Sequence, residues 1–195
     1  MSSDDGFFEQ FYAQAGDDYA AIPWARLEPR PQLVSWLDRH PPAPGTRALV
    51  VACGLGDDAE ELARRGCAVD AFDVSPTAID AARRRFPDSA VDYRVADLFA
   101  LAGDWRGAFA IVVEVMTVQS LPIELHRQAV ETITALVAPG GTLLVRAATR
   151  AEHEPAPHRP WPLRPSELAW FEADGLERVA ACEEDVVLHA AYLRR

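Results

Sequence analysis

Residues 47–59 read RALVVACGLGDDA, an apolar run that enters a glycine turn and continues as a helical pattern. A continuous apolar run flanked by turn signals is typical of a strand that is covered on both faces. Gly54 and Gly56 allow the backbone to turn sharply and to approach a ligand closely, because neither carries a Cβ. The stretch therefore predicts a strand, a tight turn and the start of a helix, with a ligand at the turn.

Strand and helix patterns alternate beyond this turn. CAVDAFD at 67–73 reads as a second strand, and Ser75 followed by Pro76 predicts a helix start, because a capping hydroxyl and a proline at the first position both favour one. Further strands are expected at 91–97, 108–115 and 142–148, a helix from 122 to 137 ending in the turn APGG (138–141), a helix from 166 to 171, and final strands at 176–183 and 186–194. This order predicts an α/β fold: a Rossmann-like, doubly wound, mostly parallel seven-stranded sheet with helices on both faces.

One domain of 195 residues is expected. It comprises an N-terminal cap segment (1–46), a ligand-binding core (47–148), a proline-rich lid or linker (149–165), and a C-terminal helix with a strand pair (166–195). Prolines at 155, 157, 160, 162 and 165 exclude a regular helix or a central strand from this part of the chain.

Charge and composition exclude several classes of partner. The formal net charge of −11 would repel a phosphate backbone, so no nucleic-acid partner is expected, and a small or cationic substrate is favoured. The acidic start MSSDDGFFEQ does not resemble a secretory signal, and no apolar run approaches the roughly 20 residues that span a bilayer. A cytoplasmic protein without membrane contact is therefore expected, whereas its oligomeric state is left open. The cysteines and histidines lack metal-ligand spacing, which predicts no metal.

Asp73 ends the second predicted strand, 19 residues after Gly54. This is the separation at which an acid meets a ribose diol in Rossmann-type nucleotide sites, so the pattern predicts a nucleotide cofactor. The pattern also fits NAD, but Asp57 and Asp58 at the helix start would repel a pyrophosphate. S-adenosylmethionine has no phosphate and carries an ammonium and a sulfonium. The alternative is that the two aspartates only complement the helix dipole.

Further motifs follow in order across residues 47–148: ALVVACGLG, AFDVSP, VADLF, VVEV (112–115) and APGGTLLV. In this combination the chain resembles the class I S-adenosylmethionine-dependent methyltransferases. The resemblance implies S-adenosyl-L-methionine as cofactor and S-adenosyl-L-homocysteine as product. It implies cofactor contacts at the glycine turn, at the ribose, at the adenine and below the methyl group, through Ala52, Cys53, Gly54, Gly56, Asp73, Val74, Asp97, Leu98, Glu114 and Val115.

The stretch YAAIPWARLEPRPQLVSWL (19–37) is similar to the lead-in of the thiopurine, halide/thiol and tellurite-resistance methyltransferases. That similarity implies that Trp24 packs over the cofactor, the alternative being an anchor for the N-terminal helix. The chain departs from the thiopurine enzymes at Glu114-Val115, where they have an Asp-Arg pair, so thiopurine is disfavoured as a substrate. Residues 116–119 would line the acceptor pocket, and their mild polarity favours a neutral or soft acceptor.

The function expected is methyl transfer to a small-molecule acceptor with a sulfur, oxygen, nitrogen or metalloid nucleophile. Positioning and desolvation suffice for such a transfer, so no catalytic residue is assigned; Glu114, Glu152, His153 and His158 are possible bases. The segment 152–165, with Trp161, is expected to cover the pocket together with Trp24, or else to be a surface linker.

Two other classes of protein remain open. An NAD-linked oxidoreductase would need a hydride-transfer pair such as Tyr and Lys, and the sequence has no lysine. A catalytically silent binding protein would be expected to lose the glycine turn or Asp73, and the sequence retains both.

Overall fold

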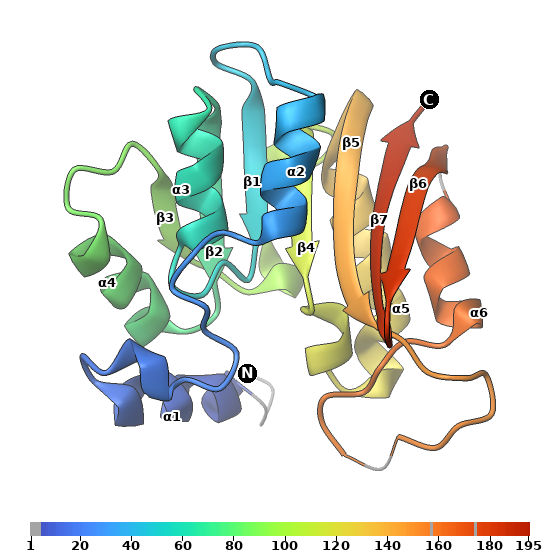
Figure 1. Ribbon diagram of the computed structural model, residues 1–195, viewed down its shortest axis with the longest axis horizontal. Coiled ribbons are helices and arrows are strands. Elements are labelled where there is room, and N and C mark those ends of the chain that lie inside the picture. The colour runs from blue at the N-terminus through green and yellow to red at the C-terminus, as the bar shows by residue number, and fades with distance from the viewer. Residues whose placement is uncertain (1–4, 157, 174) are drawn as a thin grey trace. The chain divides into compact units, whose positions relative to one another are not determined.

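The computed structural model describes residues 5–156, 158–173 and 175–195 (Figure 1). The start of the chain at 1–4 and Pro157, one of the five prolines considered above, lie outside the described residues. Two compact units are present, an N-terminal unit that ends at Asp97 and a C-terminal unit that begins at Leu98. That they act as one domain stays a prediction. Within the described ranges, no helix is both long and apolar enough to cross a membrane.

Seven strands follow the order β3-β2-β1-β4-β5-β7-β6 in one sheet. The β1–β2, β2–β3 and β4–β5 pairs are parallel, whereas β5–β7 and β6–β7 are antiparallel. The seven-stranded, mostly parallel sheet predicted from the sequence is therefore confirmed. The strands span Arg47–Val51 (β1), Ala68–Asp73 (β2), Asp92–Val95 (β3), Phe109–Val115 (β4), Val137–Ala148 (β5), Leu176–Glu184 (β6) and Val187–Arg194 (β7).

The N-terminal unit forms around β1, which is buried from Ala48 to Val51 as its apolar run predicts. Ser75 caps the helix after β2, because its hydroxyl accepts the N–H of Ala78 at 2.9 Å and Pro76 follows. In Figure 1, α1 lies beside α4, with which it is in contact. The helices of this unit are Asp5–Ala15 (α1), Tyr19–Ala21 (η1), Pro31–Arg39 (α2), Asp57–Arg64 (α3) and Pro76–Arg85 (α4).

The C-terminal unit contains β4, β5 and the β6–β7 hairpin, with Ile133 of α5 and Phe171 of η5 fully buried. Phe171 stacks on Tyr192 of β7 with ring centroids 5.7 Å apart. Its helices are Leu98–Ala100 (η2), Gly103–Trp105 (η3), Val118–Ser120 (η4), Ile123–Leu136 (α5), Pro165–Leu168 (α6) and Ala169–Glu172 (η5).

The expected turn at 138–141 is not a separate element, and this prediction is wrong. It lies inside β5, which begins at Val137, and the pairing with β4 shifts there from Phe109↔Val137 to Ile111↔Thr142. Gly141 permits this irregularity, because a Cβ there would lie 2.9 Å from the Ala138 carbonyl oxygen. The glycines thus form a bulge in the strand rather than end it.

Candidate functional site

The turn between β1 and α3 is built from left-handed backbone. Ala52, Gly54 and Gly56 have φ angles of 48°, 53° and 89°, and Gly56 is the N-cap of α3. Glycine adopts this conformation freely, whereas an L-residue such as alanine is strained in it. Strained backbone of this kind is common at ligand sites.

Two tyrosines pack against the glycines of the turn. A Cβ on Gly56 would lie 2.3 Å from the Tyr93 hydroxyl, and a Cβ on Gly54 would lie 3.0 Å from the Tyr12 hydroxyl. The sequence interpretation attributed both glycines to a closely approaching ligand. The structure adds a second reason, since side chains of the protein itself lie close to where a Cβ would be, while contact of both glycines with a ligand stays a prediction.

Asp73, at the end of β2, is joined directly to this turn. Its Oδ2 accepts the N–H of Gly54 at 2.9 Å, and its Oδ1 accepts the N–H of Ser75 at 3.0 Å. The side chain is only 6% exposed, and this burial raises the pKa of the carboxyl against the lowering effect of the Ser75, Gly54 and Val74 amides. The structure thus brings Gly54 and Asp73 together, as their spacing predicts.

Trp24 lies one side chain away from the glycine turn. Its Nε1 donates a hydrogen bond of 3.0 Å to the hydroxyl of Tyr12, the residue that packs against Gly54. The indole also makes edge contacts with Phe8 and Phe11 of α1. Trp24 therefore anchors α1, and its direct contact with a cofactor stays a prediction.

Glu9 of α1 binds the first turn of α4, a contact that sequence reasoning missed. Its Oε2 accepts the Ser75 hydroxyl at 2.5 Å, and its Oε1 accepts the Thr77 hydroxyl. Partial burial raises the pKa of Glu9, but the hydrogen bonds from Ser75 and Thr77 outweigh it and leave the pKa below its usual value. Glu9 and Tyr12 thus hold α1 against the start of α4 and against the glycine turn.

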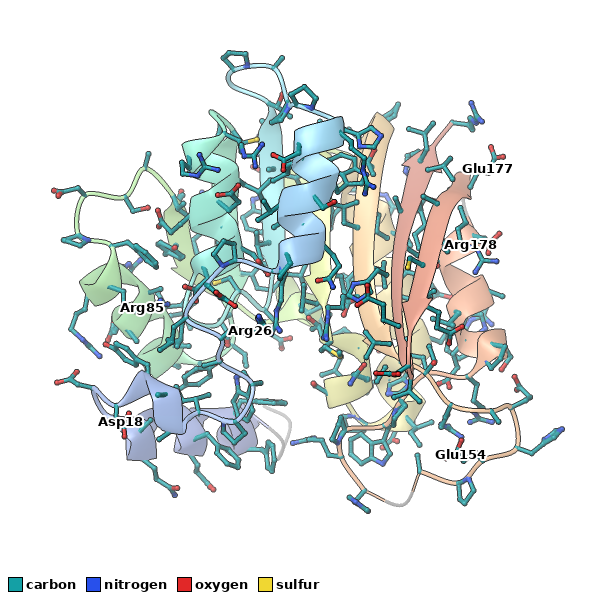
Figure 2. The ribbon with its side chains drawn as sticks, viewed as in Figure 1. Asp18, Arg26, Arg85, Glu154, Glu177 and Arg178 are labelled. Carbon is teal, nitrogen blue, oxygen red and sulfur yellow. The ribbon has the colours of Figure 1, made fainter. Side chains whose placement is uncertain are left out.

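Asp57 and Asp58, at the start of α3, already have partners in the N-terminal unit. Arg85, labelled in Figure 2, donates to both oxygens of Asp57 at 2.9 and 2.7 Å and to the Leu55 carbonyl at 2.6 Å. Asp58 accepts the backbone N–H of Arg30 at 2.7 Å. Because Arg85 offsets the charge of Asp57, the repulsion of a pyrophosphate expected from the sequence is weaker than that argument assumed.

The remaining predicted contacts of the N-terminal unit lie around these strand ends. Cys53 is half-buried, and its N–H donates to the Phe72 carbonyl at 2.8 Å, which continues the pairing of β1 with β2. Val74 is half-buried beside Asp73. Asp97 follows β3 and is exposed, one residue after Ala96, whose N–H donates to the Asp73 carbonyl at 3.0 Å.

Three predicted site residues belong to the C-terminal unit. Leu98 begins η2 and is buried, and Val115 ends β4 and is half-buried. Glu114 is 1% exposed, and its Oε1 accepts the N–H groups of Thr117 at 2.6 Å and Val118 at 3.2 Å. Burial raises its pKa to about 7, against the lowering effect of those amides.

The described part of the proline-rich segment has no regular helix or strand before Pro165, apart from one bridge between Leu163 and Thr149, as its prolines predict. It is nevertheless tied to η4, which follows β4, and to the end of β5. The N–H of Leu163 donates to the Ala148 carbonyl at 2.8 Å, and the N–H of Trp161 donates to the Gln119 carbonyl at 2.7 Å. Gln119 also accepts the N–H of Ala148 at 2.5 Å, so this polar side chain joins backbone segments.

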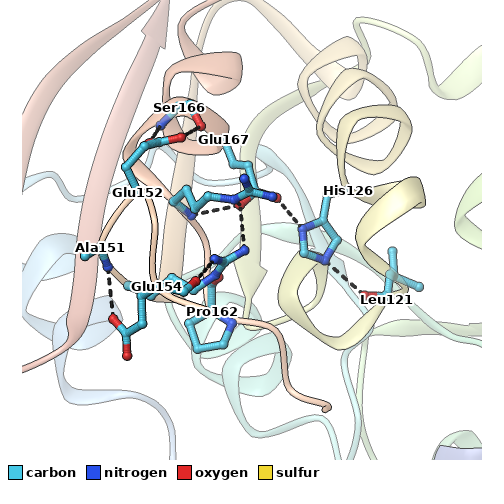
Figure 3. A network of polar contacts seen from close by, with 10 residues as sticks. Leu121, His126, Ala151, Glu152, Glu154, Pro162, Ser166 and Glu167 are labelled. Carbon is cyan, nitrogen blue, oxygen red and sulfur yellow. Dashed lines mark hydrogen bonds and ion pairs between the residues drawn. The ribbon is translucent and has the colours of Figure 1, made fainter. Parts of the chain in front are cut away.

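A buried polar network supports the end of this segment (Figure 3). Glu167 is 2% exposed, and its carboxylate accepts hydrogen bonds from His126 Nδ1 at 2.8 Å and from the backbone N–H of Arg164 at 2.9 Å. The guanidinium of Arg150 lies 3.8 Å from the same carboxylate. His126 Nε2 lies 3.0 Å from the Leu121 carbonyl oxygen. The network joins the first turn of α5 to α6 and so fixes the end of the proline-rich segment.

The possible bases on this segment differ in their surroundings. Glu152 accepts the hydroxyl of Ser166 at 2.6 Å, and the Ser166 hydrogen bonds lower its pKa, which makes it a weaker base. His153 and His158 are exposed. A groove of about 730 Å³ in this unit involves Arg150, Glu154, His158, Arg178 and Glu183, but none of the predicted cofactor contacts. In the described part of the chain, no group of three or more His, Cys, Asp or Glu residues could hold a metal ion.

Comparison with known proteins identifies the family. A family model described as a methyltransferase domain matches residues 48–141. The ubiquinone biosynthesis O-methyltransferase of Azotobacter vinelandii is 30% identical over 173 residues, which cover 76% of this chain and 72% of that protein. The chain belongs to the methyltransferase domain family, that of the class I S-adenosylmethionine-dependent methyltransferases. The class predicted from the motifs is confirmed.

The match to other relatives is more limited in extent. The ubiquinone biosynthesis O-methyltransferase of Xanthomonas campestris pv. campestris is 35% identical over 109 residues, 55% of this chain and 45% of the relative. The chain thus spans about half the length of this curated relative. A TehB-like SAM-dependent methyltransferase of Corynebacterium glutamicum has a solved structure with a TM-score of 0.71, 19% identity and coverage of 96% and 98% of the two chains. This likeness shows the shared fold.

Proposed function

We propose that the protein is an S-adenosylmethionine-dependent methyltransferase that acts on a small-molecule acceptor. The observation that carries this proposal is the 2.9 Å hydrogen bond from the Gly54 amide to Asp73. It holds a carboxylate at the end of β2 beside the left-handed turn that ends β1, and a Rossmann-type nucleoside site needs both features. Membership of the methyltransferase domain family supports the same cofactor.

Asp73 suits the ribose of such a cofactor. A carboxylate offers about four acceptor positions, and the neighbouring backbone amides occupy only part of them. Hydrogen bonds from two ribose hydroxyls would stabilise the charged form of a carboxyl whose pKa burial raises. Two ribose hydroxyls would therefore be favourable hydrogen-bond partners for the Asp73 carboxylate.

The other contacts are proposed as the family resemblance implies them. Asp97 and Leu98 would contact the adenine, Val74 the ribose, and Glu114 with Val115 would lie below the methyl group. Ala52, Cys53, Gly54 and Gly56 would form the turn around the cofactor, and Trp24 would pack over it.

Methyl transfer requires the protein mainly to position the reactants and to exclude water. When bound, S-adenosylmethionine supplies a methyl group on a sulfonium, so its leaving group is already activated. The residues around the acceptor then need to orient its nucleophile and exclude water. We propose that Trp161 and the described part of 152–165 perform the second task beside η4 and the end of β5, to which they are hydrogen-bonded.

For the acceptor, we propose a small organic molecule with an oxygen nucleophile as the first class to test. The relatives from Azotobacter and Xanthomonas are named as O-methyltransferases of ubiquinone biosynthesis. Sulfur, nitrogen and metalloid nucleophiles form the remaining classes. The net charge of −11 disfavours a nucleic-acid acceptor.

The cofactor is tested by thermal unfolding. S-adenosylmethionine and S-adenosylhomocysteine are expected to raise the melting temperature, because a ligand that binds only the native state stabilises it by mass action. NAD(H) is expected to leave the temperature unchanged. An equal rise with NAD(H), or no rise with either S-adenosyl compound, would contradict the proposal. Acceptors are then screened by the release of S-adenosylhomocysteine.

A further inference from the structure

The end of β4 carries a buried carboxylate whose two oxygens are used differently. Glu114 Oε1 accepts the N–H groups of Thr117 and Val118 at 2.6 and 3.2 Å. Its Oε2 is also buried, and no hydrogen-bond partner for it exists within the described residues. A buried oxygen without a partner is unfavourable, and in native proteins it is associated with a bound water or ion, with stored strain or with a catalytic role.

The backbone beside this carboxylate is strained. Met116 has a φ of 61°, in the left-handed region that a residue with a side chain seldom adopts. It is held there because its N–H donates to the Arg146 carbonyl at 2.7 Å, which extends the pairing of β4 with β5. The chain then folds back so that two amides reach Oε1. The loop therefore uses one oxygen of Glu114 and leaves the other available.

Two groups, one on β5 and one on β7, interact electrostatically with Glu114. Burial raises the pKa of Glu114 to about 7, opposed by the Val118 and Thr117 amides, by the Thr117 side chain and by the positive charge of Arg146 on β5. On β7, burial raises the pKa of Tyr192 to about 12, and the charge of Glu114 contributes to this rise. With its existing partners, the Glu114 carboxyl is present in both protonated and ionised forms near neutral pH. One additional positive charge nearby would favour the ionised form.

The position of Glu114 in the sheet indicates which ligand would bring a positive charge close to its carboxylate. Glu114 is the penultimate residue of β4, which runs parallel to β5, and ligands of open parallel sheets bind at the carboxyl ends of the strands. S-adenosylmethionine carries a positive charge on its sulfonium, whereas the sulfur of S-adenosylhomocysteine is a neutral thioether. We propose that Glu114 Oε2 is the counter-ion of the sulfonium, so that binding of S-adenosylmethionine releases the Glu114 proton to solvent. This proposal rests on the proposed function.

The counter-ion has a measurable consequence for cofactor choice. If only the ionised form of Glu114 binds the sulfonium, linkage requires the affinity for S-adenosylmethionine to rise by up to about tenfold between pH 6 and pH 8. The affinity for S-adenosylhomocysteine is then expected to stay nearly constant over that range. Glu114 would thereby favour the substrate form of the cofactor over its product at neutral pH.

Isothermal titration calorimetry of the full chain tests this directly. Each ligand is titrated at about pH 6.5, where a group with a pKa near 7 is mostly protonated, in two buffers of different ionisation enthalpy. The difference in heat gives the number of protons released. S-adenosylmethionine is expected to release up to one proton, and S-adenosylhomocysteine much less.

Two variants isolate the residue. In Glu114→Gln, the amide oxygen can still accept the Thr117 and Val118 amides, but no proton is available for release. Glu131→Gln is the matched control, since Glu131 is an exposed residue of α5 that pairs with Arg127. The control is expected to release protons as the wild type does, whereas Glu114→Gln is expected to release none and to lose the pH dependence of affinity.

The outcomes separate this proposal from the one on which it rests. Equal proton release with both ligands would assign Glu114 to the ammonium that they share and overturn the sulfonium proposal. Binding of S-adenosylmethionine without proton release in the wild type would overturn it as well, while leaving the cofactor established. Absence of binding by either ligand would overturn the proposed function itself. The wild-type comparison alone gives these results, even if Glu114→Gln fails to fold.

Discussion

Gly56 lacks a side chain for two separate reasons, and both predict that Gly56→Ala destabilises the protein. Its φ of 89° is left-handed, which costs an alanine roughly 1–2 kcal/mol. A Cβ would also lie 2.3 Å from the Tyr93 hydroxyl, and overpacking of this kind adds roughly 1–3 kcal/mol. We expect urea unfolding to show a loss of about 2–5 kcal/mol for Gly56→Ala.

Gly45 supplies the matched control. Its φ is 79°, but nothing lies within 4 Å of the position of a Cβ. Gly45→Ala should therefore lose only the backbone part, roughly 1–2 kcal/mol. If both variants lose the same free energy of unfolding, contact with Tyr93 does not explain the glycine at 56.

Asp73 is expected to contribute to both cofactor binding and the turn. Asp73→Ala should weaken the binding of S-adenosylhomocysteine by about 1.5–3 kcal/mol, the contribution of hydrogen bonds to a charged group. Because Asp73 also accepts the Gly54 amide, the same variant should lower the melting temperature, an effect that spacing alone did not predict. Calorimetry measures the first effect and thermal unfolding the second. An unchanged dissociation constant would remove Asp73 from the cofactor site.

At the scale of elements, α1 is predicted to depend on Glu9 for its attachment to α4. Glu9→Gln removes the charge that the hydroxyls of Ser75 and Thr77 solvate. Hydrogen bonds to a charged group contribute about 1.5–3 kcal/mol, so the free energy needed to open α1 should fall by no more than that. Amide hydrogen exchange of α1 measures the opening, and Gln14→Glu on its exposed surface is the control. Equal exchange rates in Glu9→Gln and the wild type would show that Glu9 does not hold the helix.

Sequence patterns predicted the elements that are determined by residues close to them in the sequence. The apolar run of β1 and the Ser75-Pro76 start of α4 lie within a few residues of the structure that they cause, and both were predicted within a residue or two. The pairing of Gly54 with Asp73 was also accessible, because a parallel strand pair brings the ends of consecutive strands together.

Contacts between distant residues could not be predicted in this way. Glu9 lies 66 residues from Ser75, and Asp57 lies 28 residues from Arg85, so no periodicity joins either pair. The sequence showed Asp57 as a free charge for that reason. The bulge in β5 was missed because glycine and proline usually end an element, whereas Gly141 here allows two strands to pass closely.

For the whole molecule, Glu114 is predicted to make stability depend on pH. Its pKa in the folded state, about 7, is higher than the 4.5 of an ordinary glutamate, so the folded protein holds a proton that the unfolded chain has lost. The stabilisation that this proton gives the folded state is fully present below the pKa of Glu114 in the unfolded chain. It is lost as pH rises through the pKa of Glu114 in the folded state. The difference corresponds to about 3 kcal/mol. Asp73 acts in the same direction, because burial raises its pKa also.

The cofactor-free protein should therefore be most stable at mildly acidic pH and should lose stability between about pH 5 and pH 8. Repulsion within a chain of net charge −11 complicates this trend, so unfolding by urea is measured at high salt, where exposed charges are screened. Glu114→Gln cannot ionise, and its stability should decline less over this range than that of the wild type, with Glu131→Gln as the control. If wild type and Glu114→Gln decline in parallel, the buried carboxyl does not titrate near neutral pH. A smaller decline in Glu114→Gln would place that proton on Glu114, the group that the counter-ion proposal requires to be protonated before the cofactor binds.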